Sequence, residues 1–82
     1  MLKSLEIEHF TNLTELPEWI GNLASLEELE IWRCENLTHL PSKEHMQRLI
    51  FLKQLCIEDC PRLEERCRRD GPEWPKISHI HI

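Results

Sequence analysis

Histidine and cysteine side chains near the C-terminal end of the sequence have a spacing that could bind a metal. His79 and His81 are separated by one residue, so on a strand their side chains would point to the same face. In the repeat frame described below, they align with Gln54 and Cys56 of the neighbouring strand. A structural zinc ion needs four convergent nitrogen or sulfur ligands, and only three are plausible in this arrangement. We therefore expect both histidines to be ordinary exposed strand residues, and we expect neither a bound metal nor another cofactor.

The four cysteines offer a second kind of chemistry. Cys34 and Cys60 share one repeat position, so their Cα atoms should lie about a strand spacing apart, near disulfide range. No signal peptide pattern is visible, which favours a reducing compartment and a packed pair of thiols. The same argument predicts that the two N-x-T patterns, at Asn12 and Asn36, are not glycosylated. Cys56 and Cys67 are predicted to be more accessible and to oxidise more readily.

Catalytic and nucleotide-binding patterns are missing from the sequence. None of the five histidines has an orienting partner at motif spacing, and with two glycines there is no phosphate-binding loop. We therefore do not expect an enzyme. The net charge of −5 argues against a nucleic-acid or anionic-membrane partner, and no apolar run approaches the length of a membrane span.

A repeat supplies the elements that position these side chains. The frame LxxLxIxx[FC]xxLxxLP begins at Leu2 and Leu26, and its first part recurs at Leu52 and at Ile77. The offsets of 24, 26 and 25 residues fall in the range of leucine-rich repeats. The alternation of Leu and Ile within each LxI favours a strand over an amphipathic helix.

The repeat predicts an α/β fold: a leucine-rich-repeat solenoid with a short parallel sheet of about four strands and an irregular or short helical convex side. All 82 residues form a single domain, with repeats at 2–25, 26–51 and 52–76 and a terminal strand at 77–82. Phe10, Cys34 and Cys60 are predicted to point inward after each strand. The third repeat has Arg66 and Cys67 where Leu-Pro is expected, which indicates a polar convex side at a solenoid end.

The third repeat and the tail carry a more specific pattern. Cys60-Pro61-Arg-Leu63-Glu-Glu-Arg66-Cys67, followed by Trp74-Pro-Lys-Ile-Ser-His-Ile80, resembles the last leucine-rich repeats of plant nucleotide-binding leucine-rich-repeat (NLR) disease-resistance proteins. The resemblance implies a cytoplasmic immune receptor whose repeats recognise pathogen effectors or help to hold the receptor inactive. The nucleotide-binding module of such receptors is not in this sequence, so nucleotide binding is not carried over.

The frame also predicts which side chains form the concave, binding face of the sheet. Nine residues are predicted to lie there: Glu6, Glu8, Glu28, Glu30, Trp32, Gln54, Glu58, His79 and His81. The face is acidic with a central tryptophan, so we expect a basic or mixed-charge protein partner, either a pathogen effector or another receptor domain. The uncapped first repeat also predicts self-association through the N-terminal edge. The alternative function is a structural one, a capping or self-associating repeat fragment with no recognition role.

Overall fold

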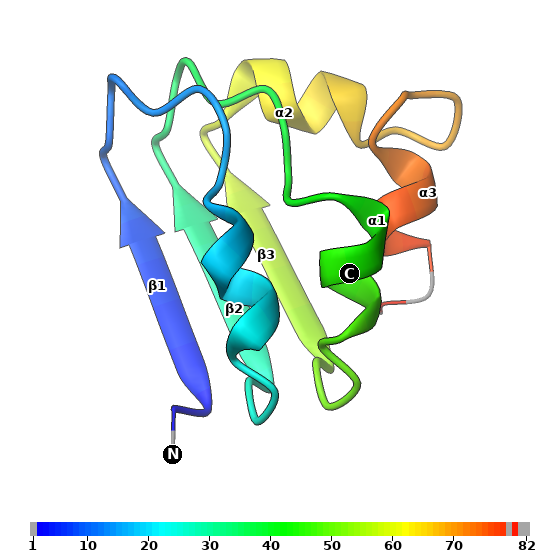
Figure 1. The fold of residues 1–82 in the computed structure, drawn as a ribbon. Coiled ribbons are helices and arrows are strands. Elements are labelled where there is room, and N and C mark those ends of the chain that lie inside the picture. Colours follow the sequence, from blue (N-terminus) through cyan, green and yellow to red (C-terminus); the bar gives the residue numbers. More distant parts are fainter. Residues whose placement is uncertain (1, 79, 81–82) are drawn as a thin grey trace.

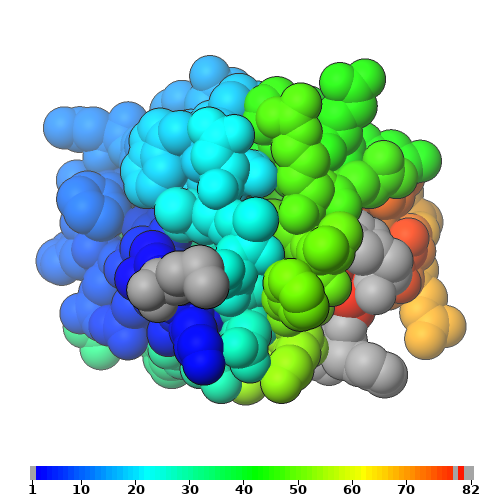
Figure 2. All heavy atoms as spheres, turned by 60° about the horizontal axis from the view of Figure 1, so that its bottom comes forward, coloured from blue at the N-terminus to red at the C-terminus, as the bar shows by residue number. Residues whose placement is uncertain are grey.

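Three parallel strands form the sheet in this computed structural model, which describes residues 2–78 and 80 (Figure 1). They are β1 (Ser4–Glu8), β2 (Glu28–Trp32) and β3 (Gln54–Glu58), and they lie in chain order. Their register follows the repeat frame, because Leu5 pairs with Leu29 and Leu29 with Leu55. Figure 2 shows the consequence in bands of colour that cross the molecule from blue through green to orange, so that successive repeats lie side by side.

The core lies between the sheet and the helical segments. Leu29, Ile31 and Leu55 point from the strands into it, and Ile20 and Met46 cover it from the opposite side. Leu29, Ile31 and Leu55 alternate along their strands with outward-facing residues, so burial of one face follows from the period-two pattern. The thiols of Cys34 and Cys60 are fully buried, as the frame predicts.

Short helices cover one face of the sheet. The 3-10 helix η1 (Glu18–Asn22) follows β1, and α1 (Lys43–Gln47) follows β2 (Figure 1). Ser42 caps α1, because its hydroxyl accepts a hydrogen bond from the backbone N–H of His45. Gly21 allows η1 to approach α1 closely, since a Cβ at this position would lie 2.8 Å from the Cβ of His45.

Each strand ends in the same unusual backbone conformation. His9, Arg33 and Asp59 follow the last residue of β1, β2 and β3, with φ angles of 62°, 53° and 55°. The left-handed region is unfavourable for residues with a Cβ, so each of these turns carries a small conformational cost. In all three repeats this turn lies at the point where the chain leaves the sheet.

The predicted fourth strand is wrong in the described residues. Trp74–Ile77 forms a short helix, α3, Ser78 lies in a turn, and Ile80 lies in a bend. Pro75 lies in the first turn of α3, where its fixed φ favours a helix. Ile77 and Ile80 are both buried at a spacing of three residues, which fits the helical alternative that the sequence analysis rejected. His79 and His81 lie outside the described residues.

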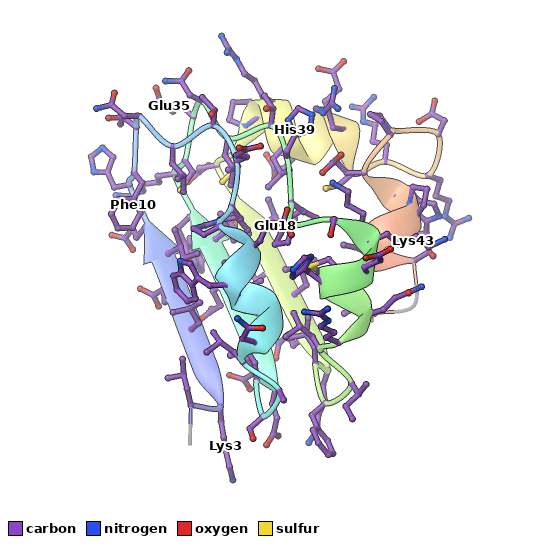
Figure 3. The ribbon with its side chains drawn as sticks, in the orientation of Figure 1. Lys3, Phe10, Glu18, Glu35, His39 and Lys43 are labelled. Carbon is purple, nitrogen blue, oxygen red and sulfur yellow. The ribbon has the colours of Figure 1, made fainter. Side chains whose placement is uncertain are left out.

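The prediction that Phe10 points inward is also wrong. Its side chain is 56% exposed, whereas Cys34 and Cys60 at the same repeat position are fully buried. Figure 3 places Phe10 at the outer edge of the molecule, beside the end of β1. The difference arises because the outer side of repeat 1 is an end of the stack.

The opposite end of the stack is closed by the C-terminal segment. Helix α2 (Pro61–Arg66) follows β3, and α3 packs beside α1 (Figure 1). Side chains from this segment bind the backbone of repeat 2: Arg66 Nε donates to Thr38 O at 3.0 Å, and Lys76 Nζ donates to Leu40 O at 3.0 Å. These two carbonyl oxygens of repeat 2 have no backbone partner in repeat 3. The polar side chains that were predicted for the last repeat bind them instead.

Candidate functional site

The sheet face turned away from the helices, here called the open face, carries most of the predicted site residues. The register places three columns on it. These columns are Ser4–Glu28–Gln54, Glu6–Glu30–Cys56 and Glu8–Trp32–Glu58. Seven of the nine predicted residues are thus brought together, and the other two, His79 and His81, lie outside the described residues. The residues that face the other way pack into the core, so only the outward-facing set is free to meet a partner.

Negative charge is concentrated on the open face. Glu6 and Glu30 are direct register partners, and like charges opposite one another on neighbouring strands are destabilising. Within residues 2–78 and 80, no lysine or arginine forms an ion pair with any glutamate of this face. Partial burial raises the pKa of the Cys56 thiol, and the charges of Glu58 and Glu30 raise it further. The glutamates of the open face therefore carry negative charge that no lysine or arginine of the described residues neutralises by an ion pair.

Trp32 lies in the middle of this charge. It pairs with Glu8 on one side and with Glu58 on the other, and its ring is half-buried. A large, partly buried aromatic side chain loses little conformational freedom on binding and supplies much apolar contact area, as interface anchors do. An aromatic centre with a charged rim is an arrangement suited to protein recognition.

Two apolar residues outside this face were missed by the sequence interpretation. Ile50 and Phe51, in the turn before β3, are 75% and 58% exposed. A comparison of the repeats in the sequence could have indicated them, because the corresponding turn before β2 contains the small residues Ala24 and Ser25. Two large apolar side chains thus replace two small ones at the equivalent turn.

The four cysteines are separate thiols that form no disulfide. All four are free, and Cys60 Sγ accepts a 3.4 Å hydrogen bond from the backbone N–H of Cys34. Burial raises the pKa of the Cys60 thiol, which favours the neutral, unreactive form. Burial, followed by the nearby Glu73 carboxylate, also raises the pKa of the Cys67 thiol to about 11. This environment argues against the predicted ready oxidation of Cys67.

Metal ligands do not converge in the described part of the chain. No group of three or more His, Cys, Asp or Glu side chains there could hold a metal ion. The described residues also contain no helix with the length and hydropathy needed to cross a membrane.

Parallel strands that repeat every 24 to 26 residues, each followed by short helical segments, define the chain as a leucine-rich-repeat protein. A comparison with protein families shows which kind of leucine-rich repeat the chain contains. The model described as R13L1/DRL21 leucine-rich repeats matches residues 1–60, and the chain belongs to this family.

A curated relative agrees with this assignment. TMV resistance protein N of Nicotiana glutinosa is 38% identical over 68 residues, which cover 82% of this chain and 5% of the relative. The chain thus spans only a small part of this relative's length. No solved structure matches it significantly. The resemblance to the leucine-rich repeats of plant disease-resistance receptors is confirmed.

Proposed function

We propose that the open face binds a protein with a basic or mixed-charge surface. The observation that carries this proposal is the position of Trp32, half-buried and flanked in register by Glu8 and Glu58. Unpaired glutamates on neighbouring strands cost free energy in the isolated sheet, and a cationic partner would turn that cost into attraction. Leucine-rich repeats form extended binding surfaces on their sheet side, which supports the choice of this face.

The role we propose for this interaction is recognition in plant immunity. The relative that matches most of this chain is named as a resistance protein against a virus, and the family model is one of leucine-rich repeats. Two partners fit the charge: a basic pathogen effector, or a basic surface of another receptor domain that the repeats would hold inactive. Both would act in the cytoplasm, and both use the open face without any catalytic step.

The test compares two tryptophan variants in a direct binding assay. The purified chain is titrated by calorimetry against candidate basic effectors and against the nucleotide-binding domain of a resistance receptor. Trp32→Ala should weaken binding at least tenfold, because the anchor of the face is removed. Trp19→Ala is the matched control: this tryptophan is 54% exposed but lies in η1, away from the open face.

A second pair of variants tests the charge. Glu6→Gln with Glu30→Gln should slow association and reduce the dependence of affinity on salt, because steering by the open face is lost. Glu64→Gln with Glu65→Gln, which removes the same charge from α2, should leave both unchanged. Binding that survives Trp32→Ala but is lost in Trp19→Ala would contradict the proposal and place the interface at the N-terminal edge.

A structural role is the second candidate function. The observation that favours it is the closure of the C-terminal end by Arg66 and Lys76, which bind the backbone of repeat 2. A unit closed in this way would terminate a stack of repeats without recognising a partner of its own. The mass in solution separates the two: a monomer that binds a partner through Trp32 supports recognition, whereas an obligate oligomer that binds none supports the structural role.

A further inference from the structure

The turn before β3 presents two large apolar side chains to solvent. Ile50 is 75% exposed and Phe51 is 58% exposed. They occupy the central positions of a turn that is closed by a 3.1 Å hydrogen bond from the backbone N–H of Leu52 to Leu49 O. Leu49 and Leu52, at the ends of the turn, are buried and make its contact with the core. The two apolar side chains between them therefore contribute little to packing.

The equivalent turn of repeat 1 shows that the fold does not need large apolar residues at these positions. That turn has the same hydrogen bond, from the backbone N–H of Leu26 to Leu23 O at 2.9 Å. Its central residues are Ala24 and Ser25. Since a small and a polar residue form the same turn, the folding of the chain does not explain the exposed pair before β3. Adjacent exposed apolar side chains of this kind are typical of an interaction site.

Positive charge surrounds the turn. Residues 45–57 contain no Asp or Glu, although the chain has 15 of them, and this stretch includes Arg48 and Lys53. Within residues 2–78 and 80, Arg48 forms no ion pair with a carboxylate. Lys53 pairs with Glu27 at 3.0 Å, and the pKa of the Glu27 carboxyl is lowered by Lys53 first and by the charge of Lys3 as well. Three cations and one carboxylate give this group of four side chains a net charge of +2.

The turn and its cations lie at the end of the sheet where the strands begin. Figure 1 shows the turns before β2 and β3 at its lower end, where β1 also begins, and Figure 3 labels Lys3 there. Trp32 pairs with Glu8 and Glu58 at the opposite end of the strands. The four residues from Glu28 to Trp32 span about 13 Å of strand, whereas the Debye length is about 8 Å at physiological ionic strength. The glutamates beside Trp32 are therefore largely screened from a surface that contacts the turn.

We propose that this turn contacts an anionic lipid surface. Ile50 and Phe51 enter the headgroup region of the bilayer, and the three cations, at positions 3, 48 and 53, lie against the lipid phosphates. The net charge of the whole chain disfavours such a surface, but the cations gather where the apolar pair protrudes, and salt screens the more distant carboxylates. Two apolar side chains and three cations make a reversible contact. The proposal goes beyond recognition at the open face and leaves Trp32 accessible.

A protein groove fits this turn less well. A standard protein interface buries about 800 Å² of each partner, far more than two side chains of a turn can offer. Ile50 and Phe51 project outward, so a protein partner would have to supply a pocket that encloses them. A bilayer needs no complementary shape, since it admits apolar side chains between its headgroups and attracts the flanking cations.

Vesicle sedimentation tests the proposal with the 82-residue chain. At low salt, the chain should sediment with vesicles made of equal parts of phosphatidylcholine and phosphatidylserine, and not with vesicles of phosphatidylcholine alone. Ile50→Ala with Phe51→Ser, called the turn variant, should lower the partition coefficient at least tenfold, because the apolar insertion is lost. It copies the turn of repeat 1, so its urea midpoint should match that of the parent. Phe10→Ser is the matched control: Phe10 is 56% exposed, but it lies beyond the other end of β1, and its loss should leave sedimentation unchanged.

A second pair of variants tests the charge. Arg48→Gln with Lys53→Gln should lower the partition coefficient at least fivefold and weaken its dependence on salt, because both cations lie beside the inserted turn. Arg62→Gln with Arg68→Gln removes the same charge from α2 and the segment after it, beyond the carboxyl end of β3. This control should change the partition coefficient less than about twofold, because salt screens distant charges.

Three results would overturn the proposal at the vesicles themselves: no sedimentation of the parent chain, equal sedimentation with neutral and anionic vesicles, or equal sedimentation of the turn variant and the parent. Self-association in light scattering that the turn variant loses would also overturn it, because a second copy would then be the occupant. Trp32→Ala should leave sedimentation unchanged, and a loss in this variant would place the contact on the open face instead. Failure here is thus distinct from failure of the recognition proposal, which uses no lipid.

Discussion

The Oε1 atom of Glu73 accepts a 2.7 Å hydrogen bond from the backbone N–H of Leu40, which lies 33 residues earlier in the chain. Repeats 1 and 2 are joined at this level by a parallel bridge between Glu15 and His39. Such a bridge extended to repeat 3 would need one donor for Thr38 O and one acceptor for Leu40 N. Arg66 Nε supplies the donor and Glu73 Oε1 the acceptor, so two side chains replace a strand and end the ladder.

Glu73 is expected to be among the most sensitive polar residues of the chain. It is 2% exposed, and its carboxylate also binds Lys76 Nζ at 3.0 Å. Glu73→Ala should lower the free energy of unfolding by about 2–4 kcal/mol, because Leu40 N and Lys76 lose their partner in a buried site. Urea denaturation measures this loss. Glu73→Gln keeps an acceptor for Leu40, so it should cost less; equal losses in both variants would show that the hydrogen bond to Leu40 contributes little.

Arg33 tests the cost of the left-handed turns. Its side chain is exposed and its φ is 53°, so replacement mainly changes the backbone preference. Arg33→Gly should leave stability unchanged or raise it by about 0.5 kcal/mol, since relief at positive φ slightly exceeds the entropy cost of glycine. Arg33→Val should lower stability by about 1–2 kcal/mol, because a β-branched residue resists this region. The melting temperature of Arg33→Val should therefore lie below that of the parent and that of Arg33→Gly at or above it, and a stabilising Arg33→Val would contradict this expectation.

Frame-equivalent leucines should differ in their contribution to stability. Leu29→Ala should lower the free energy of unfolding by about 2–4 kcal/mol, as expected for truncation of a fully buried leucine. Leu5→Ala should cost about half as much, because Leu5 is partly exposed at the edge of the stack. Chemical denaturation of both variants gives the comparison. Equal costs would mean that the edge is covered in solution, which dilution of the sample would then reveal.

Cys67 should show a strong pH dependence. Its pKa of about 11 lies above that of an unfolded thiol, so the folded state favours the neutral form. Stability from this group is fully present at neutral pH and is lost as the pH rises from about 9 towards 11. At pH 8 only about one thiol in a thousand is ionised, so alkylation should be slow and should accelerate about tenfold per pH unit. Mass spectrometry after iodoacetamide treatment locates the label; labelling of Cys67 at pH 8 as fast as in urea would contradict the burial argument.

Most of the sheet could be predicted from the sequence. The pairing of Leu5 with Leu29 and of Leu29 with Leu55 follows from a pattern that repeats in the chain, because each repeat contacts only its neighbours. The same periodicity brings Glu6, Glu30 and Trp32 to one face, since strand side chains alternate. The composition of the candidate binding surface was therefore available before the structure.

The ends of the stack were decided by tertiary structure. Ile77 and Ile80 fit both a strand frame and a helical spacing, but Ile77 ends α3, which packs beside α1, and Ile80 lies in a bend. Phe10 occupies an inward position of the frame, yet it is exposed because no neighbour covers repeat 1. A repeat pattern determines how neighbouring repeats of the same frame pair and pack against one another. Where the stack ends, the partner is not another copy of the pattern, so the outcome depends on which side chains reach across, as Glu73 does to Leu40.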